Sequence, residues 1–292
     1  MNTSFCPDCP RHCRVDRAAG QLGICGAPAH FRVARIAPHY WEEPPISGTR
    51  GSGTVFFSGC SLRCVFCQNR AISREGRGEE MDDGELIDRI LALQEEGVHN
   101  INLVTPTHYV TRLRGILERL RPKLHIPVVY NCGGYEDAAA LRGLEGLVDI
   151  YLPDFKYISP ELAKNYSGVA DYADVASVAL SEMYRQVGGV QFNDDAMMTR
   201  GMIVRHLVLP GCRQDSMAVL KELGQLLPIQ DIRLSLMAQY TPDFAQDQPY
   251  VNLRRRLTTF EYTSVLKVAD ELGFDGYRQS PESVGVKFTP EF

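Results

Sequence analysis

The chain has no stretch that stays apolar over the length of a membrane-spanning helix. Its first residues, MNTSFCPDCPRHC, contain neither an apolar core nor a small-residue cleavage site, so no secretory signal is visible. We therefore expect a cytoplasmic protein with no membrane partner.

An excess of positive charge is also missing. Lys and Arg number 31 against 36 Asp and Glu, which gives a formal net charge of −5. A nucleic-acid partner is not expected, because binding to a phosphate backbone depends on a basic surface. The one dense basic run, LRRRL at residues 253–257, is interpreted as a solvated surface segment.

Cysteine, in contrast, is abundant for a protein of a reducing compartment, and the number of cysteines, nine, is odd. A disulfide framework explains such a set poorly, and metal or redox chemistry explains it better. The cysteines fall into an N-terminal group, a second group and two isolated residues: Cys6, Cys9, Cys13 and Cys25; Cys60, Cys64 and Cys67; Cys132 and Cys212.

From residue 54 onward, short apolar runs alternate with segments of helical periodicity. Six strands are predicted, at residues 54–57, 101–104, 127–131, 148–154, 202–209 and 233–240. The last helix, at 258–273, is predicted to begin with a capping box of Thr258 and Glu261 and to end at Gly273. This alternation indicates an α/β fold with a parallel sheet. We expect a partial TIM-type (β/α)6 barrel over residues 51–292, preceded by a Cys-rich metal-binding extension over residues 1–50.

The carboxyl ends of parallel strands carry the chemistry in such folds. Polar, glycine and cysteine residues follow every predicted strand: Cys60 to Cys67, TPTH at 105–108, NCGG at 131–134, DFK at 154–156, LPGC at 209–212, and QY at 239–240. We expect these turns to converge on one mouth.

The loop after the first predicted strand has the spacing C-x3-C-x2-C. Thiolates at this spacing could bind zinc or an iron–sulfur cluster. A structural zinc requires a fourth ligand, whereas a [4Fe-4S] cube on three cysteines leaves one iron open for a cofactor or substrate. We predict the cluster on Cys60, Cys64 and Cys67, with a zinc knuckle as the alternative.

At these residues the sequence resembles the radical S-adenosylmethionine (SAM) superfamily, in which an aromatic residue, here Phe66, precedes the last cysteine. The resemblance extends over nearly the whole chain. The segments GSGTVFFSGCSLRCVFCQN, NLVTPTHYV, DIYLPDFKY and RHLVLPG, with the N-terminal CPDCPRHC, resemble the branch of pyruvate formate-lyase activating enzyme-like (PflX-like) proteins.

The resemblance implies a radical SAM enzyme. Its reduced cluster would cleave SAM to a 5′-deoxyadenosyl radical that abstracts hydrogen from a substrate. In an activating enzyme the substrate is a glycyl-radical enzyme, and a reductant such as flavodoxin or ferredoxin is a further expected partner. A small molecule or peptide is the alternative substrate, because fold similarity does not fix the substrate. A non-catalytic iron- or zinc-binding protein is the remaining alternative.

Carried over residue by residue, the resemblance also implies a set of cofactor contacts: Phe66, Thr105, Thr107, Asn131, Asp154, Lys156, His206 and Gln239. TPTH departs from the glycine-rich turn of the family, so Thr105 and Thr107 would have to supply oxygens. The ammonium of Lys156 suits the methionine carboxylate as a point charge. Packing is the alternative for each, and His206 is equally a core histidine.

Cys132 and Cys212 are candidate catalytic thiols, as a second hydrogen-atom donor or a methyl acceptor. The alternative is that each is a small buried hydrophobic residue.

The N-terminal cysteines lie in a segment too poor in apolar residues to fold unaided, so a metal could supply the missing free energy. Four thiolates suit a closed zinc site or a second iron–sulfur cluster, and zinc is slightly favoured as a structural metal. Because Cys6, Cys9, Cys13 and Cys25 precede the C-x3-C-x2-C loop, the resemblance assigns them no electron-relay role.

Overall fold

A computed structural model of the chain describes residues 5–279. Its strands are β1 (Phe31–His39), β2 (Ser52–Phe57), β3 (Glu79–Met81), β4 (Ile101–Val104), β5 (Val128–Cys132), β6 (Ile150–Pro153), β7 (Gln191–Phe192), β8 (Met198–Leu207), β9 (Arg233–Met237) and β10 (Gly276–Arg278). The sheet order is β10-β9-β8-β6-β5-β4-β2-β1-β3, with β7 paired to β8.

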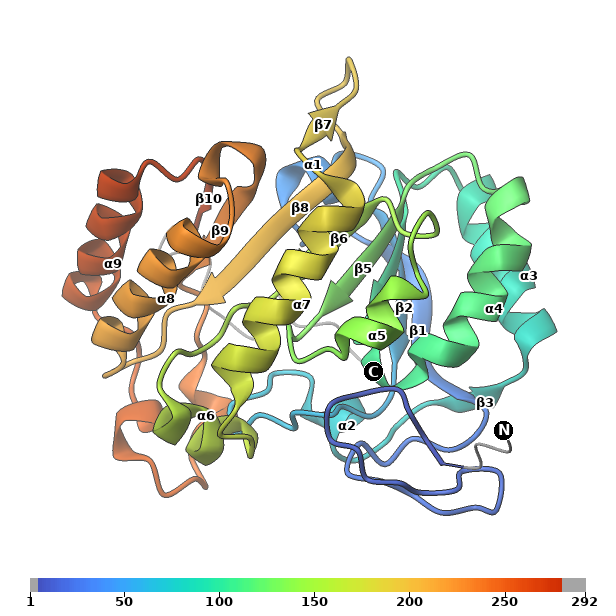
Figure 1. Cartoon of the computed structure of the whole chain (residues 1–292), viewed down its shortest axis with the longest axis horizontal. Helices are drawn as coiled ribbons and strands as arrows, with labels where there is room; N and C mark the ends of the chain where they lie inside the picture. Colours follow the sequence, from blue (N-terminus) through green and yellow to red (C-terminus); the bar gives the residue numbers. More distant parts are fainter. Residues whose placement is uncertain (1–4, 280–292) are drawn as a thin grey trace.

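The six strands predicted from the sequence are neighbours in this sheet and run parallel, in the order β2, β4, β5, β6, β8 and β9. The strand β10 continues the parallel run, whereas β1 and β3 pair antiparallel at the opposite edge. Within the described residues β10 and β3 are the two edge strands and do not pair with each other. The sheet is therefore an open, partial barrel (Figure 1). The predicted α/β class and partial-barrel architecture are confirmed.

The helices are α1 (Pro44–Ser47), α2 (Arg70–Ser73), α3 (Asp83–Glu95), α4 (Val110–Leu120), α5 (Ala138–Arg142), α6 (Pro160–Ser167), α7 (Tyr172–Val187), α8 (Arg213–Leu226) and α9 (Thr259–Leu272). Short 3-10 turns lie at Thr107–Tyr109, Arg121–Lys123, Ile229–Asp231, Pro242–Ala245 and Val251–Arg254. No helix in residues 5–279 combines the length and the apolar character needed to cross a membrane.

Side-chain caps begin both α3 and α9, and those of α9 are the ones predicted from the sequence. Asp82 caps α3 by accepting a hydrogen bond from the amide of Glu85. Thr258 and Glu261 form the predicted capping box of α9, and Gly273 ends that helix in the left-handed conformation. Residues Thr107–Tyr109 form a 3-10 turn, and α4 begins directly after it at Val110.

The two faces of the sheet differ in what they bury. Alternate side chains of a strand point to opposite faces. On β5, Tyr130 and Cys132 pack into the large core beneath the helices, whereas Val129 belongs to a small inner cluster with Ile150 of β6. The inner cluster comprises Ile46, Val129, Ile150, Leu152, Met198 and Ile203. By the same alternation, Asn131 and Arg205 share the inner face with this cluster.

The strand β1 was not predicted, although it lies within the segment predicted to be the N-terminal extension. Residues 31–39 pair with β2 along almost their full length, and a register irregularity lies between Val33 and Arg35. Polar residues and Pro38 interrupt the apolar alternation of β1, which concealed the strand. The N-terminal extension is therefore hydrogen-bonded into the sheet through its last residues.

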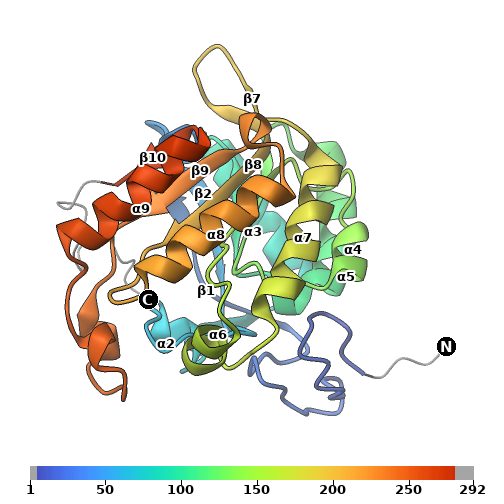
Figure 2. The same cartoon turned by 60° about the vertical axis from the view of Figure 1, so that its left-hand side comes forward.

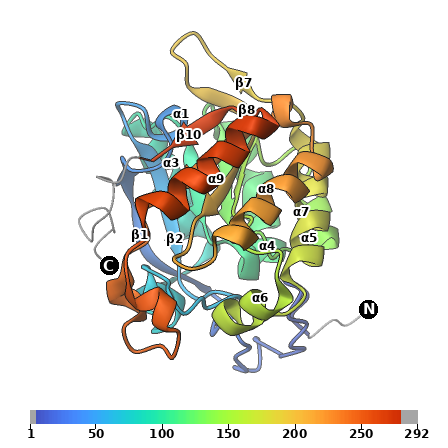
Figure 3. The same ribbon diagram turned by 90° about the vertical axis from the view of Figure 1, so that its left-hand side faces the viewer.

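Segments distant in the sequence gather at the carboxyl ends of the parallel strands. The N-terminal segment, α2, α6 and residues 240–254 lie together at this end, at the bottom of Figure 1, while the β7–β8 hairpin lies at the opposite end. Figures 2 and 3 show the same arrangement from two further sides, with α8 and α9 covering the outer face. The predicted mouth is thus lined by these four segments.

Two glycines with nearly the same backbone conformation offer a test of the packing at this mouth. Gly134 has φ +80° and Gly146 has φ +78°. A Cβ added at Gly134 would lie 2.1 Å from the carbonyl oxygen of Asp154, whereas one at Gly146 would meet nothing within 4 Å. Gly146→Ala should therefore cost only the left-handed backbone penalty, about 1–2 kcal/mol.

Gly134→Ala should reduce the free energy of unfolding by clearly more than Gly146→Ala, since the backbone of Asp154 must also move. Chemical denaturation of both variants measures the difference. Equal losses would mean that the turn is not packed against Asp154.

Candidate functional site

The C-x3-C-x2-C loop connects β2 to α2 and is fixed by backbone hydrogen bonds from other segments. The amide of Cys60 donates to the carbonyl of Cys25 at 3.3 Å, and the amide of Val65 donates to the carbonyl of Tyr166 at 2.8 Å. Gly59 adopts φ +95°, and a Cβ there would lie 2.6 Å from the carbonyl oxygen of Cys25. A glycine is therefore required where the loop leaves β2.

The three thiols of this loop lie close enough to influence one another. Burial and the charges of Cys64 and Cys67 raise the pKa of the Cys60 thiol to about 12. The Cys64 sulfur lies 3.0 Å from the hydroxyl of Ser167, and Ser73 donates a hydrogen bond to the Cys67 sulfur at 3.4 Å. Three thiolates in this setting need a compensating positive charge, which a metal cluster would supply.

Within residues 5–279, no group of three or more His, Cys, Asp or Glu side chains is placed to hold a single metal ion. In a [4Fe-4S] cube each thiolate binds a different iron, so the sulfurs need not converge on one point, and the loop fits such a cluster.

The turns after β5 and β6 lie beside the cysteine loop. A Cβ added at Gly133 would lie 2.9 Å from Leu62 and 3.8 Å from Lys156, so this turn is packed between the loop and the lysine. Lys156 forms an ion pair with Asp154, and the two side chains are largely buried. Burial opposes a charged lysine, but the charges of Asp154 and Cys64 outweigh it and raise the pKa of Lys156. The lysine is therefore held as an ammonium next to the thiols.

Arg205 of β8 connects several of the predicted cofactor contacts. Its guanidinium donates to Asp154 at 3.0 Å, to Glu42 at 3.3 Å and to the side-chain oxygen of Asn131. The Asn131 amide in turn donates to Glu42 at 3.1 Å. Burial would raise the pKa of Asp154, but the charges of Lys156 and Arg205 outweigh it and keep that pKa low.

The neighbouring side chains on the inner face leave polar atoms unpaired. One carboxylate oxygen of Glu43 and the side-chain oxygen of Asn102 are buried without a hydrogen-bond partner among the described residues. Burial raises the pKa of both Glu42 and Glu43, against the opposing charge of Arg205. The inner face thus combines three acidic side chains with two cationic ones, and Glu42 and Glu43 enter it from the segment before α1, which lies at the end of the sheet opposite the mouth (Figure 1).

Glu42, Glu43 and Arg205 are not among the site residues predicted from the sequence. The two glutamates precede the first predicted strand, in a segment assigned to the extension, and carry no local motif. Arg205 could have been found, since it precedes His206 in a predicted strand and must face the opposite side of the sheet.

Thr107 is buried, and its side chain binds the carboxylate of Glu136. Its hydroxyl donates to Glu136 at 2.6 Å, and the hydroxyl of Tyr130 donates to the other oxygen of the same carboxylate at 3.0 Å. Thr105, in contrast, has φ +57° and is only partly buried at the end of β4. Of the two threonines, Thr105 is the one at the end of β4 whose hydroxyl is not bound to Glu136.

His206 and Cys132 belong to the helix-covered face. The His206 Nδ1 lies 2.7 Å from the carbonyl of Phe155, its Nε2 has no partner within residues 5–279, and burial lowers its pKa to about 4. The Cys132 thiol is fully buried, which together with the charge of Glu136 raises its pKa well above the ordinary value. Both side chains nevertheless lie close enough to Asp154 for its charge to affect their pKa values.

The remaining predicted residues lie near the mouth. The Phe66 ring packs edge-on against Tyr166 and Tyr240, with centroids 6.4 and 6.3 Å apart. Gln239 follows β9, and its side-chain oxygen accepts a hydrogen bond from Gln279 at 2.9 Å. Cys212 lies at the N-terminus of α8 with its sulfur 3.9 Å from the Tyr166 hydroxyl, and burial raises its pKa to about 11.

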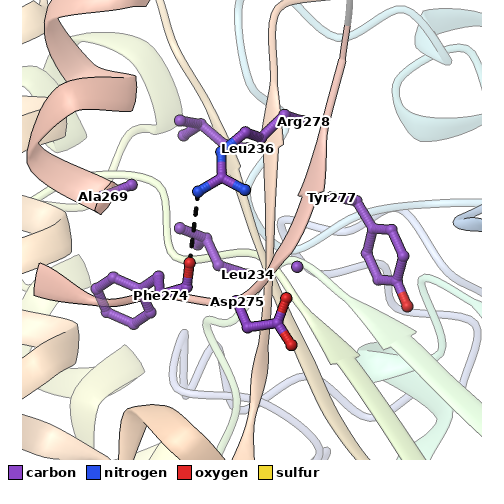
Figure 4. A pocket seen from close by; sticks show the side chains of 8 residues that line it. Leu234, Leu236, Ala269, Phe274, Asp275, Tyr277 and Arg278 are labelled. Atoms are coloured by element: carbon purple, nitrogen blue, oxygen red, sulfur yellow. Dashed lines mark hydrogen bonds between the residues drawn. The ribbon is translucent and has the colours of Figure 1, made fainter. Parts of the chain in front are cut away.

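One further hollow lies away from this mouth. Figure 4 shows it between β9, β10 and α9, where Leu234, Leu236 and Phe274 form its apolar wall and Arg278 donates to the carbonyl of Phe274. None of its lining residues belongs to the turns that carry the predicted site.

A family model described as Radical SAM superfamily matches residues 54–185, which begin in β2 and end in α7. The match covers 132 of the 292 residues, and this part of the chain is similar to a radical SAM domain. A domain of this superfamily implies an enzyme that uses a [4Fe-4S] cluster and SAM, in agreement with the predicted chemistry.

Two further similarities extend beyond this radical SAM domain. An uncharacterized protein of Methanocaldococcus jannaschii is 26% identical over 282 residues, which cover 92% of this chain and 75% of that protein. The crystal structure of methylornithine synthase (PylB) aligns with a TM-score of 0.49 at 15% identity, covering 74% of this chain and 63% of that one. The chain thus spans less than two thirds of that synthase. The PflX-like branch stays a prediction.

The buried Glu136 of the radical SAM domain predicts a pH effect on stability. Burial raises the pKa of its carboxyl to about 7 from an ordinary 4.5. Because the folded chain binds this proton more tightly, the carboxyl contributes stability below pH 4.5 that is lost as the pH rises through 7. From pH 4.5 to 7, the free energy of unfolding should fall by about 3 kcal/mol relative to Glu136→Gln, which does not titrate.

Denaturant titrations of both proteins across this range measure the difference. Glu79→Gln, which alters an exposed carboxylate of β3, is the control and should follow the wild type. Parallel curves for wild type and Glu136→Gln would contradict the prediction.

Proposed function

We propose that the protein is a radical SAM enzyme whose cluster is held by Cys60, Cys64 and Cys67. When bound, the cluster and SAM supply a one-electron cleavage that yields methionine and a 5′-deoxyadenosyl radical, which takes hydrogen from a substrate. The observation that carries the proposal is the meeting of this loop with the Gly133 turn and Lys156 at the carboxyl ends of parallel strands.

The chain's own residues would bind and orient the cofactor. The ammonium of Lys156, held by Asp154, is suited to the carboxylate of the methionine moiety. The ring of Phe66, between Tyr166 and Tyr240, provides an apolar wall beside the loop that would exclude water. Arg205 would position Asp154 and Asn131 without itself needing to touch the cofactor.

The test is anaerobic reconstitution with iron and sulfide, reduction, and detection of 5′-deoxyadenosine and methionine formed from SAM. Cys64→Ala should reduce this cleavage to the level without protein, because the cube loses one of its three thiolates. Lys267→Ala, at an exposed position of α9, is the matched control and should retain the wild-type rate. A wild type that cleaves no SAM would favour the non-catalytic metal-binding alternative.

Two substrate classes follow from this chemistry. The resemblance to activating enzymes supports a glycyl-radical enzyme as substrate. The charged inner face supports a small polar molecule or peptide instead, because a glycine has no side chain to meet Glu42, Glu43 and Arg205. We infer that the unpaired oxygen of Glu43 would accept a hydrogen bond from such a substrate.

The transfer of hydrogen distinguishes these substrates. A glycyl-radical enzyme as substrate would give a protein glycyl signal by electron paramagnetic resonance (EPR), and deuterium would move from its labelled glycine to 5′-deoxyadenosine. With a polar substrate, Glu43→Gln should raise the KM for that substrate at least tenfold while leaving uncoupled SAM cleavage within twofold of wild type. A glycyl signal that Glu43→Gln leaves unchanged would contradict the polar-substrate inference.

A further inference from the structure

The charged network on the inner face of the sheet has more acids than cations. Asp154 forms ion pairs with both cations of the network, Lys156 and Arg205. Arg205 is shared, because its guanidinium also contacts the carboxylate of Glu42 at 3.3 Å. Glu43 is the third acid, and its Oε2 atom has no hydrogen-bond partner within residues 5–279. Two cations thus serve three carboxyl groups, and one negative charge is left over.

Two buried acceptors without donors lie around Glu42. The amide of Asn102 donates to Glu42 at 3.1 Å, but its own Oδ1 atom has no partner in the part of the chain that the structure describes. The charge of Glu42 also acts on the adjacent Glu43, which has the other unpaired oxygen. Glu43 is 8% exposed and Asn102 is fully buried. Leaving such acceptors unpaired is unfavourable, so they point to a donor that the described residues do not supply.

This group reaches the level of the mouth, although its two glutamates come from the segment before α1 at the opposite end of the sheet (Figure 1). Asn131 is the last inward-facing residue of β5, and its amide donates to the carboxylate of Glu42 at 3.1 Å. Arg205 connects the same carboxylate to Asp154, which follows β6. A ligand held here would therefore extend from the glutamates toward the turns of the proposed cofactor site.

The other sources of positive charge do not match the surplus. Arg233, two residues before Ser235 on the same face of β9, forms an ion pair with Asp275 at 3.3 Å. No group of three or more His, Cys, Asp or Glu side chains in residues 5–279 is placed to hold a metal ion, which disfavours a metal as the missing cation. A proton is the compensation left to the unliganded chain, and burial raises the pKa of both Glu42 and Glu43.

We propose that Glu42, Glu43 and Asn102 form an ammonium site, which binds a primary ammonium group of the substrate. The inference rests on the proposed function and names its substrate class, a small molecule or peptide that carries an amine. One ammonium balances the one surplus carboxylate, and its three N–H donors suit the two unpaired oxygens. A hydroxyl would donate to one of these oxygens but would leave the buried charge uncompensated.

Binding of a small amine to the full reconstituted chain tests the charge without turnover. The probe is butan-1-amine, which is cationic at neutral pH as a lysine side chain is. Butan-1-ol has the same length and also donates a hydrogen bond, but it is neutral. In a calorimetric titration the amine should bind about tenfold more tightly than the alcohol, or better. Equal affinities would contradict the ammonium site, since they would show selection for a donor and not for a charge.

A charge-neutral variant locates the binding. Glu43→Gln keeps a hydrogen-bond acceptor but removes the charge, so butan-1-amine should bind about tenfold more weakly, or worse. The affinity for butan-1-ol should stay within about twofold of wild type. Glu79→Gln, which alters an exposed carboxylate of β3, is the matched control and should bind both probes as wild type does. An unchanged affinity of Glu43→Gln for the amine would overturn the inference.

A second variant tests the same charge if Glu43→Gln fails to fold, which would appear as loss of its cooperative unfolding transition. Glu42→Gln removes the surplus charge at the carboxylate that Arg205 contacts. Its affinity for butan-1-amine should also fall by about tenfold or more. Binding of the amine as tightly as wild type would contradict the ammonium site.

The outcomes separate this inference from the proposed function. Wild type that prefers the amine over the alcohol but cleaves no SAM would overturn only the proposed function. Wild type that cleaves SAM but binds the amine no better than the alcohol would overturn only the ammonium site.

Discussion

The parallel register of the central strands is the constraint on which the site depends. Backbone pairing places Phe56, Val104, Asn131 and Leu152 in one row across β2, β4, β5 and β6. The turns that follow these residues therefore leave the sheet at one level. A slip of one residue in any pair would also exchange the inner and outer faces of that strand. Register alone thus brings the cysteine loop to Lys156 and keeps Asn131 on the inner face.

Buried charge is the second feature of this mouth. Glu42, Asp154 and Arg205 have little contact with solvent, and their ion pairs offset a desolvation cost that would otherwise be several kcal/mol for each charge. Such a network contributes little net stability compared with apolar packing. Its place beside the predicted cofactor contacts is better explained by binding, because fixed charges orient a polar ligand without reorganising. The unpaired oxygen of Glu43 agrees with this explanation.

The sequence predicted the six parallel strands because their apolar runs are short, uninterrupted and bounded by polar turns. It also predicted that the turns converge, since parallel strands end on one side. It did not predict β1, whose pattern is broken by polar residues and Pro38. His206 and Cys132 are buried, as the alternatives of a core histidine and a small buried residue allowed, and a single sequence does not decide between these alternatives because burial depends on tertiary packing. The contact between Cys25 and Cys60 is tertiary and has no local signal.

The N-terminal extension is hydrogen-bonded to the C-x3-C-x2-C loop, which lies in the part of the chain that is similar to a radical SAM domain. The central claim is the vacant iron at Cys60, Cys64 and Cys67. Electron–nuclear double resonance of the reduced protein with SAM labelled at the methionine nitrogen and carboxylate tests it most directly. Coupling of the labelled nuclei to the cluster is the result predicted. A cluster spectrum without such coupling, with a protein side chain bound to the fourth iron, would contradict the claim.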